Sequence, residues 1–387
     1  MKKILFSTAL VWLAVVSVGP PRTSAQRLSA VPIAVETRIA PIPVKANGVM
    51  HLLYELHLTN FSARNIELVR VEVLDDSSNP KKLASYKETD LTSRLALPGA
   101  GQVPDKRVIA GGMRAVVFIE IEFDRSTQIP SALQHRLFFK STDGRGEDAI
   151  ETARLAVKRI LPPVVASPLR GDGWVALSGM SNTSGHRRTI VVVNGQARIA
   201  QRFATDWVRT GADGLAFRGD PAKLSNWSAY GAEVHSVGPG TVADVRDGIP
   251  ENDPTAEKKA VPITVDSAPG NYIIIDMGHG YFSFYAHLQP NSIRVKKGDR
   301  VRRGQVIALL GNSGNSDSPH LHFHITDGNS PLGAEGMPYV LEAFEVLGTL
   351  SSKGLLIKGG WKPEPGRSAD KRRLEVPTEN AVVRFPE

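Results

Sequence analysis

The stretch from Pro319 to Ile325 alternates histidine with large apolar residues, and this alternation restricts it to an extended strand with two unlike faces. One face carries three histidines and the other three apolar side chains: His320, His322 and His324 against Leu321, Phe323 and Ile325. The apolar face is suited to a core. Neighbouring imidazoles are costly to bury unbonded and are the commonest metal ligands near neutral pH, so the polar face predicts a metal-binding or acid–base site. A solvated face on a half-buried strand is the alternative, because His-x-His alone is a loose motif.

The N-terminal segment predicts export. Two lysines precede the apolar run Ile4–Val18, and Thr23–Ser24–Ala25 forms a small-residue cleavage site, a pattern typical of a secretory signal over residues 1–25. The apolar run is shorter than a bilayer span. We therefore expect a protein exported to the periplasm or the extracellular cell envelope, without a membrane span after signal cleavage. An uncleaved N-terminal anchor is the alternative.

Composition narrows the class of partner. The chain has no cysteine, which excludes disulfides and thiolate chemistry, and an exported protein without disulfides is consistent with a bacterial envelope. The net charge of +8 suits an anionic envelope polymer, although solubility alone would explain it equally well. The basic residues are scattered and no RNA- or DNA-reading motif is present, so we expect no nucleic-acid partner. The sequence leaves the oligomeric state open.

Strand-type segments separated by turns predict an all-β fold, and 387 residues are enough for two domains with sizeable cores. Residues 26–165 predict an immunoglobulin-like β-sandwich that serves as a spacer or adaptor. Prolines near residue 162 mark a stiff linker, and residues 170–348 predict a second β-rich domain. Residues 349–387 are basic and proline-rich, and they predict a loosely held tail.

The segments before the histidine strand belong to the same domain. Asp276–Leu288 predicts a strand, a glycine turn and a second strand that ends near His287. Val295–Ile307 predicts a hairpin with two tight glycine turns. A long polar stretch lies between Asp247 and Gly270, and a loop of that length in a compact domain is usually functional or disordered. We expect this loop to wall the cleft of the site.

Four motifs in this domain occur in order: Tyr285–Ala286–His287–Leu288, the hairpin from Gly298 to Gly304–Gln305, Gly311–Asn312–Ser313–Gly314, and Pro319–His320–Leu321–His322–Phe323. In these motifs and their spacing the chain resembles, from about Tyr230 to Ile325, the lysostaphin/LytM-type zinc metallopeptidases that cut peptidoglycan peptides. Four ordered signals are far more specific than His-x-His alone. The resemblance implies a duplicated-hybrid-motif-like fold whose sheet floors a groove, one Zn2+ ion, and peptidoglycan peptides as substrate.

The resemblance also implies a role for each matching residue. His322 would be a zinc ligand, and His320 and His287 would flank the open coordination position. One of these two would take the proton of the metal-bound water, and together they would stabilise the tetrahedral oxyanion. Zinc hydrolases keep three protein ligands and one open site, and the ion lowers the pKa of bound water to about 7.

The other two ligands of this family normally come from His-x-x-x-Asp, and here the matching segment departs from the pattern. Asp206 is in place as the carboxylate ligand, but Arg202 holds the histidine position, and a guanidinium cannot coordinate zinc. We expect Arg202 to pair with Asp206 or with a nearby surface acid. If it pairs with Asp206, the metal site would be absent.

His186 is our candidate for the missing ligand. It lies in a Gly/Ser turn, and a predicted hairpin around Asn194–Gly195 would bring it back beside Asp206. A plain loop histidine is the alternative. His279, in a glycine-flanked turn that is expected to face solvent, is the next candidate.

Two further histidines are not expected to be ligands. His235 lies in a strand and is expected to be a partly buried structural residue. His324 shares the face of His322 one step further on, and a bond to a ligand or solvent exposure is expected for it.

The predicted function is therefore a secreted zinc metalloendopeptidase that acts on peptidoglycan, with metal ligands and catalytic residues as follows: His186, Asp206 and His322; His287 and His320. The alternative is a catalytically inactive peptidoglycan-binding or hydrolase-activator module on the same fold. Arg202 favours that alternative, and the retention of both predicted catalytic histidines argues against it. An acyl-carrier-type barrel, suggested by the glycine hairpin alone, lacks the exposed lysine that such carriers need at a hairpin tip.

Overall fold

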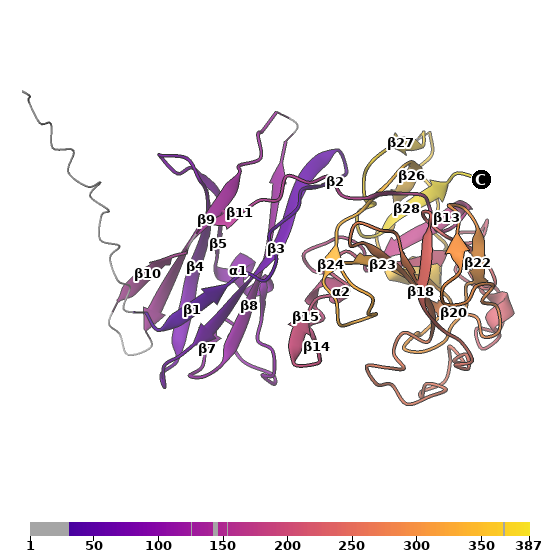
Figure 1. Ribbon diagram of the computed structural model, residues 1–387, viewed down its shortest axis with the longest axis horizontal. Coiled ribbons are helices and arrows are strands. Elements are labelled where there is room, and N and C mark those ends of the chain that lie inside the picture. The colour runs from indigo at the N-terminus through magenta and orange to yellow at the C-terminus, as the bar shows by residue number, and fades with distance from the viewer. Residues whose placement is uncertain (1–30, 125, 142–145, 153, 367) are drawn as a thin grey trace, which may run out of the picture.

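The computed structural model describes residues 31–124, 126–141, 146–152, 154–366 and 368–387. Nearly all of its regular structure is β, as the sequence predicted, and the strands form two units that follow each other along the chain (Figure 1). No helix in these described ranges is long and apolar enough to cross a membrane. The predicted secretory signal, residues 1–25, lies outside the described residues.

The N-terminal unit is a sandwich of two antiparallel sheets that share one core. The first sheet has the order β1-β3-β8-β6 with β2 on β3, and the second has the order β10-β9-β4-β5 with β7 on β4 and β11 on β9. The first comprises β1 (Ile33–Glu36), β2 (Val44–Ala46), β3 (Val49–Asn60), β6 (Leu95–Ala96) and β8 (Arg114–Phe123). The second comprises β4 (Ile66–Asp75), β5 (Lys82–Lys87), β7 (Val108–Ile109), β9 (Ala132–Ser141), β10 (Glu147–Glu151) and β11 (Leu155–Ala156), and α1 (Glu88–Ser93) follows β5. An immunoglobulin-like relationship stays a prediction.

Side chains alternate between the two faces of β3, and this alternation explains how the sandwich contacts the C-terminal unit. One set of side chains fills the core between the two sheets: Leu52, Tyr54, Leu56 and Leu58. The other set points to the opposite face and is also buried: His51, Leu53, Glu55 and His57. This second face is buried because the C-terminal unit covers it, and Leu53 packs into the core of that unit.

The C-terminal unit is built on one antiparallel sheet of eleven strands in the order β21-β18-β19-β20-β23-β16-β13-β28-β26-β27, with β24 on β23. Its strands are β13 (Gly171–Leu177), β16 (Thr205–Arg209), β18 (Gly240–Arg246), β19 (Asn271–Asp276), β20 (Phe282–Leu288), β21 (Arg300–Val301), β23 (Leu321–Thr326), β24 (Gly336–Met337), β26 (Phe344–Thr349), β27 (Asp370–Arg372) and β28 (Ala381–Phe385). Three two-stranded pairs complete it: β12 (Val164–Val165) with β25 (Val340–Leu341), β14 (Val191–Val193) with β15 (Gln196–Arg198), and β17 (Glu233–His235) with β22 (Val306–Leu309). The short helices are α2 (Gly185–Arg188), η1 (Leu224–Asn226) and η2 (Lys353–Leu356).

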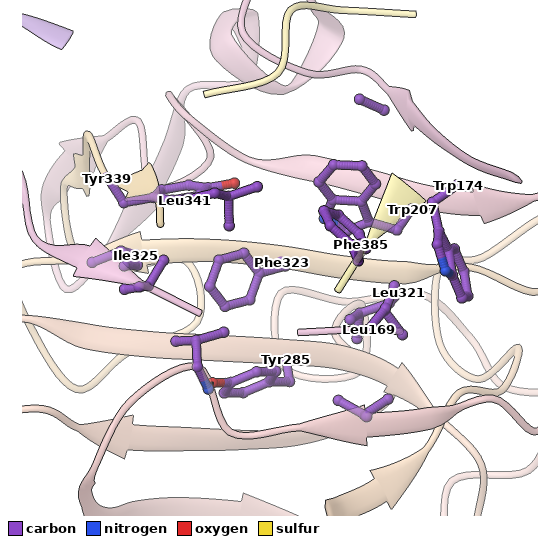
Figure 2. Packing of buried hydrophobic residues seen from close by; sticks show 14 of the residues in the cluster. Leu169, Trp174, Trp207, Tyr285, Leu321, Phe323, Ile325, Tyr339, Leu341 and Phe385 are labelled. Carbon is purple, nitrogen blue, oxygen red and sulfur yellow. The ribbon is translucent and has the colours of Figure 1, made fainter. Parts of the chain in front are cut away.

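The apolar face of β23 lies in the main core of this unit (Figure 2). The rings of Phe323 and Tyr285 lie 5.2 Å apart between centroids, and those of Trp207 and Phe385 lie 5.0 Å apart. Every residue of β23 is buried, on both faces of the strand. The expectation of a solvated polar face is therefore wrong, and the buried histidines of β23 need partners within the protein.

The prediction of a loosely held tail over residues 349–387 is also wrong. β28 lies inside the large sheet, hydrogen-bonded to β13 on one side and β26 on the other. Four of its five residues are buried: Ala381, Val382, Val383 and Phe385. The strand is short and follows a proline-rich, charged segment, so its own sequence gives little periodicity to detect.

The predicted hairpin around Asn194–Gly195 is present as β14 and β15. Both turn residues have positive φ, 49° at Asn194 and 74° at Gly195, as a two-residue turn that matches the strand twist requires. Figure 1 shows this hairpin and α2 between the sandwich and the large sheet. His186, which belongs to α2, therefore lies at the junction of the two units.

We expect His135 of β9 to make the sandwich sensitive to acid. Its ring is buried, with Nε2 2.8 Å from Oη of Tyr54 and Nδ1 3.2 Å from Oγ1 of Thr152, and burial lowers its pKa to about 4. Below about pH 6.5 the imidazole of His135 is protonated in the unfolded chain, but in the folded sandwich it stays neutral until the pH reaches about 4. The stabilising effect is therefore complete above pH 6.5 and is lost as the pH falls through this window, by about 3 kcal/mol.

Amide hydrogen exchange in β3 and β9, corrected for the intrinsic rate, checks this expectation. Protection should fall between about pH 6.5 and about pH 4 in the wild-type chain. His135→Gln keeps a polar side chain beside Tyr54 but does not titrate, so it should make the profile shallower, while His57 of β3, whose pKa burial also lowers to about 4, keeps its own contribution. The same pH dependence in both proteins would contradict the assignment to His135.

Candidate metal centre

The register between β16 and β23 places Asp206 beside His322. The two residues are directly opposite each other in this antiparallel pair, so their side chains project from the same face of the sheet. Nδ1 of His322 lies 2.9 Å from Oδ1 of Asp206. On the other side of β23, the residue opposite His322 is Ala286 of β20, a small side chain that lines the cleft.

His186 reaches the same carboxylate from α2. Its Nε2 lies 3.2 Å from Oδ2 of Asp206, and its ring lies edge-on to that of His322 with 4.7 Å between centroids. Nδ1–H of His186 donates to the carbonyl oxygen of Ser178 at 3.0 Å. Because Nδ1 is held by that bond, Nε2 is the ring nitrogen that faces Asp206.

These three residues form a group that could hold a metal ion. One ligand atom from each of His186, Asp206 and His322 lies within 4.8 Å of the others. Two imidazole nitrogens and one carboxylate oxygen are donors that first-row divalent metals accept. The candidate chosen from the sequence to replace the missing histidine is therefore brought to Asp206, as the predicted hairpin required.

His324 supports the ring of His322 from behind. Its Nδ1 lies 2.9 Å from Nε2 of His322, and its ring stacks at 4.7 Å on that of Phe284. His324 is fully buried, so of the two expectations for it the bond to His322 is confirmed and solvent exposure is wrong. This contact fixes the ring of His322 with Nδ1 toward Asp206, as bonded neighbours of metal-binding histidines do.

The rings of His320 and His287 lie beside each other, with 4.7 Å between their centroids. Nδ1–H of His320 donates to the carbonyl oxygen of Ser318 at 2.8 Å, and Nδ1–H of His287 donates to that of Ser313 at 2.8 Å. Nε2 of His320 lies 3.4 Å from Oδ1 of Asp206. Backbone carbonyls thus hold one nitrogen of each ring, and both rings line the cleft.

Burial and the charge of Asp206 set the protonation of this cluster. Burial opposes ionisation of Asp206, but the neighbouring His186 and His320 outweigh it and hold the pKa of the carboxyl well below its usual range. Burial acts to lower the pKa of His320, yet Asp206 raises it overall. Burial dominates at His287 and places its pKa well below the usual value. The two cleft histidines therefore differ in basicity, which suits an acid and a base at one site.

His287 adopts an unusual backbone conformation that the sequence did not signal. Its φ is 61°, in the left-handed region where a non-glycine residue is uncommon, and the pairing of β19 with β20 shifts register near it. Its N–H donates to the carbonyl oxygen of Pro269 at 3.1 Å, and its own carbonyl accepts from the N–H of Gly311. Irregular strand ends of this kind redirect a side chain, here into the cleft.

Arg202 does not contact Asp206. Its Nε lies 3.0 Å from Oε2 of Glu55, its Nη2 lies 2.8 Å from Oε2 of Glu335, and its Nη1 donates to the carbonyl oxygen of Gly336 at 3.0 Å. Both expectations for Arg202 are wrong, since neither acid is Asp206 and both acids are buried. The guanidinium is held by Glu55 of the sandwich and by Glu335, and it does not line the cleft that contains Asp206 and His322.

The remaining histidines considered as ligands lie elsewhere. His279 is exposed in its glycine-flanked turn, with φ at 54°. His235 is buried in β17, with Nε2 3.9 Å from a carboxylate oxygen of Glu233. Neither lines the cleft.

A cleft of about 580 Å³ lies over the histidine cluster. The loop between Asp247 and Gly270 forms one wall through Thr264, Val265, Ala268 and Pro269, as predicted. Thr189 and Val191, at the start of the β14–β15 hairpin, line it as well. The loop and the hairpin thus line the same cleft as the histidines.

Asn252 anchors the loop, and sequence reasoning missed it. Its side-chain amide donates to three carbonyl oxygens of the segment before His320, those of Asn312, Gly314 and Ser316, at 2.8 to 3.0 Å. A lone asparagine in a polar loop carries no local signal of such a role.

Part of this chain is similar to a known protein family. Residues 226–333 match the profile of Peptidase family M23. A stretch of 80 residues, 21% of this chain and 18% of the relative, is 40% identical to the peptidoglycan DD-endopeptidase ShyB of Vibrio cholerae. ShyA of the same organism is 45% identical over 65 residues, 17% of this chain and 15% of that protein. The match thus spans less than a fifth of these relatives.

Solved structures of peptidases align with parts of this chain at low sequence identity. The catalytic domain of lysostaphin from Staphylococcus simulans aligns at 20% identity and a TM-score of 0.23, over 43% of this chain and 84% of that one. A zinc-containing peptidase from Vibrio cholerae aligns at 17% identity and a TM-score of 0.23, over 74% of this chain and 80% of that one.

We expect Arg202→Met to destabilise the folded chain strongly, because it leaves Glu55 and Glu335 buried with one guanidinium fewer. Breaking a buried ion pair from one side costs about 3–5 kcal/mol. Arg384→Met is the matched control, since Arg384 pairs with Glu345 at 2.9 Å but both side chains are partly exposed, and it should cost less than about 1 kcal/mol. Urea unfolding measures both variants. Equal, small losses would contradict the buried network.

Proposed function

We propose that this protein is a zinc endopeptidase that hydrolyses peptide bonds in cell-wall peptidoglycan, a proposal supported by the match of residues 226–333 to Peptidase family M23. The observation that carries the proposal is the convergence of five side chains at the cleft floor: His186, Asp206 and His322 with His287 and His320. The relatives named as peptidoglycan DD-endopeptidases support the substrate class, and the sequence markers of export support action in the envelope.

The donor set fits a catalytic zinc site. Nε2 of His186, a carboxylate oxygen of Asp206 and Nδ1 of His322 would hold the ion, which leaves a position free, as zinc hydrolases require. When bound, Zn2+ supplies a Lewis acid that polarises the scissile carbonyl and activates water near neutral pH. The carbonyl of Ser178 and the ring of His324 fix the two ligand imidazoles before any ion arrives, so little reorganisation accompanies binding.

His320 and His287 would carry the proton transfers. Because each Nδ1–H is engaged by a backbone carbonyl, each Nε2 is left to accept a proton from water or to donate one to the substrate. In its protonated form either ring can hydrogen-bond the oxygen that gains charge as the carbonyl becomes tetrahedral. Their ring centroids are 4.7 Å apart, so both could act on one peptide bond.

The substrate peptide would lie along the cleft. The loop between Asp247 and Gly270 and the hairpin side at Thr189 and Val191 leave room for an extended chain. The net charge of +8 favours approach to an anionic polymer such as the cell wall. The inactive binding module is not favoured, because the residue that suggested it, Arg202, is paired with Glu55 and Glu335.

The purified chain should bind about one equivalent of zinc through its three ligands. His186→Ala and His322→Ala should each weaken zinc binding at least about tenfold, as a lost ligand must. His279→Ala, which removes an exposed histidine outside the cleft, should leave the affinity unchanged. Elemental analysis and competition with a chelating dye measure this. A well-folded wild-type chain that takes up no zinc at neutral pH would refute the metal site.

Hydrolysis should depend on the cleft histidines separately from zinc. His320→Ala should slow the release of cross-linked peptides from purified cell walls by about 10²-fold or more while zinc content stays at the wild-type level. His235→Ala, in a buried strand away from the cleft, serves as the control. Mass spectrometry of the released fragments identifies the bond cut. Full activity of His320→Ala would remove that residue from the mechanism.

A further inference from the structure

Four charged side chains are buried together where the sandwich meets the C-terminal unit: Glu55, Arg187, Arg202 and Glu335. None is more than 3% exposed. Two guanidiniums face two carboxylates, so the group is balanced in charge. Groups of this kind are costly to bury and tolerate the loss of a member poorly, which makes their placement a strong constraint on the backbone around them.

Arg187 ties α2 to the first sheet of the sandwich. Its Nη2 donates to the carbonyl oxygens of Tyr54 at 3.1 Å and Ile119 at 2.7 Å, and its Nε lies 3.4 Å from Oε1 of Glu55. Tyr54 and Glu55 belong to β3, and Ile119 to β8. The sandwich therefore supplies three of the groups that hold this guanidinium.

Arg202 is held by the same sandwich carboxylate. Its Nε contacts both oxygens of Glu55, at 3.2 and 3.0 Å, while Glu335 holds Nη2 from the C-terminal unit. Glu55 thus lies between two arginines that are 15 positions apart in the chain and that belong to different segments of the second unit.

Both arginines neighbour the metal-binding residues. Arg187 directly follows His186 within α2, and Arg202 comes four positions before Asp206, in the segment that leads into β16. The carboxylate of Glu55 therefore binds both chain segments that carry the predicted ligands His186 and Asp206. The third, His322, is held separately by the β16–β23 register and by His324.

We propose that Glu55 is a positioning residue for the metal centre: by holding Arg187 and Arg202 it fixes His186 against Asp206, so that metal affinity depends on the docked sandwich. The inference rests on the proposed zinc site. It gives the N-terminal unit a function in assembling the active site, beyond that of a spacer.

The physical reason is the tolerance of a metal site. Ligand atoms must be held to within about 0.5 Å, and residues that support ligands indirectly change affinity by about 10–100-fold when they are lost. With Glu55 neutralised, Arg202 still contacts Glu335, whereas Arg187 loses the carboxylate that it contacts, and the two guanidiniums repel each other. Arg187 then relaxes toward water, and the backbone of α2 moves with it, together with His186.

The test compares Glu55→Gln with Glu375→Gln in the full chain. Glu375 is a matched control: it is 3% exposed, and it also bridges the two units, through Nζ of Lys45 at 3.0 Å and the N–H of Gly48 at 3.1 Å. It lies next to none of the predicted ligands in the sequence. The readouts are zinc affinity by competition with a chelating dye, the visible spectrum of the Co2+-loaded protein, and the melting temperature.

We expect Glu55→Gln to weaken zinc binding by about 10–100-fold and to alter the Co2+ spectrum at saturation, and Glu375→Gln to change neither at a similar loss of melting temperature. If Glu55→Gln does not fold, Glu55→Asp replaces it, because it keeps the charge but withdraws the carboxylate; it should lose part of the zinc affinity.

Wild-type affinity and spectrum in whichever Glu55 variant folds would overturn the inference while leaving the zinc site intact. Equal losses in the Glu55 and Glu375 variants would also overturn it, since general docking would then suffice. A wild-type chain that binds no zinc would overturn the proposed function itself.

Discussion

The register between β16 and β23 is the constraint on which both the core and the site depend. It pairs Asp206 with His322 and, one residue on, Trp207 with Leu321. Side chains alternate across a strand, so a slip of one residue would send Asp206 to the opposite face from His322 and pull Trp207 out of the core. Trp207 and Leu321 are both fully buried among apolar neighbours. The packing of Trp207 and Leu321 therefore also fixes the distance between the two candidate ligands, Asp206 and His322, and the site needs no separate scaffold.

The imidazole rings near Asp206 differ in their hydrogen-bond partners. The rings of His186, His287 and His320 each donate one N–H to a backbone carbonyl, whereas His322 is backed by another histidine. Carbonyl partners set which nitrogen is free and in which direction it points, before any substrate or ion is present. Asp206 contacts three of these four histidines, and burial gives the four rings unequal basicity. Such a cluster is suited to proton transfer over short distances.

Local patterns in the sequence predict much of this structure. Contacts between residues that are far apart in the chain could not be predicted from it. The alternation at β23 and the glycine-containing motifs around His287 and His320 point to their strand and cleft, because both follow from the residues next to each other. His186 was selected as the histidine that a hairpin could bring close to Asp206. The Asn194–Gly195 turn predicts that hairpin. The partners of Arg202 were not found, since Glu55 lies 147 positions and Glu335 133 positions away and neither belongs to any motif. The last strand was missed because five residues are too few for a period to stand out.

The position of β28 has a consequence for how the chain reaches its native state. It pairs Phe385 with Gly171 and Val383 with Trp174, joining the two ends of the C-terminal unit within one sheet. Contacts between residues so distant along the chain must close a long loop before they gain anything, and they form slowly. Until Ala381–Phe385 has been synthesised and docked, β13 and β26 each expose an unpaired edge, and a ribosome-bound chain that lacks these residues is in that state. Synthesis must therefore reach these residues before the sheet that carries Asp206 is complete.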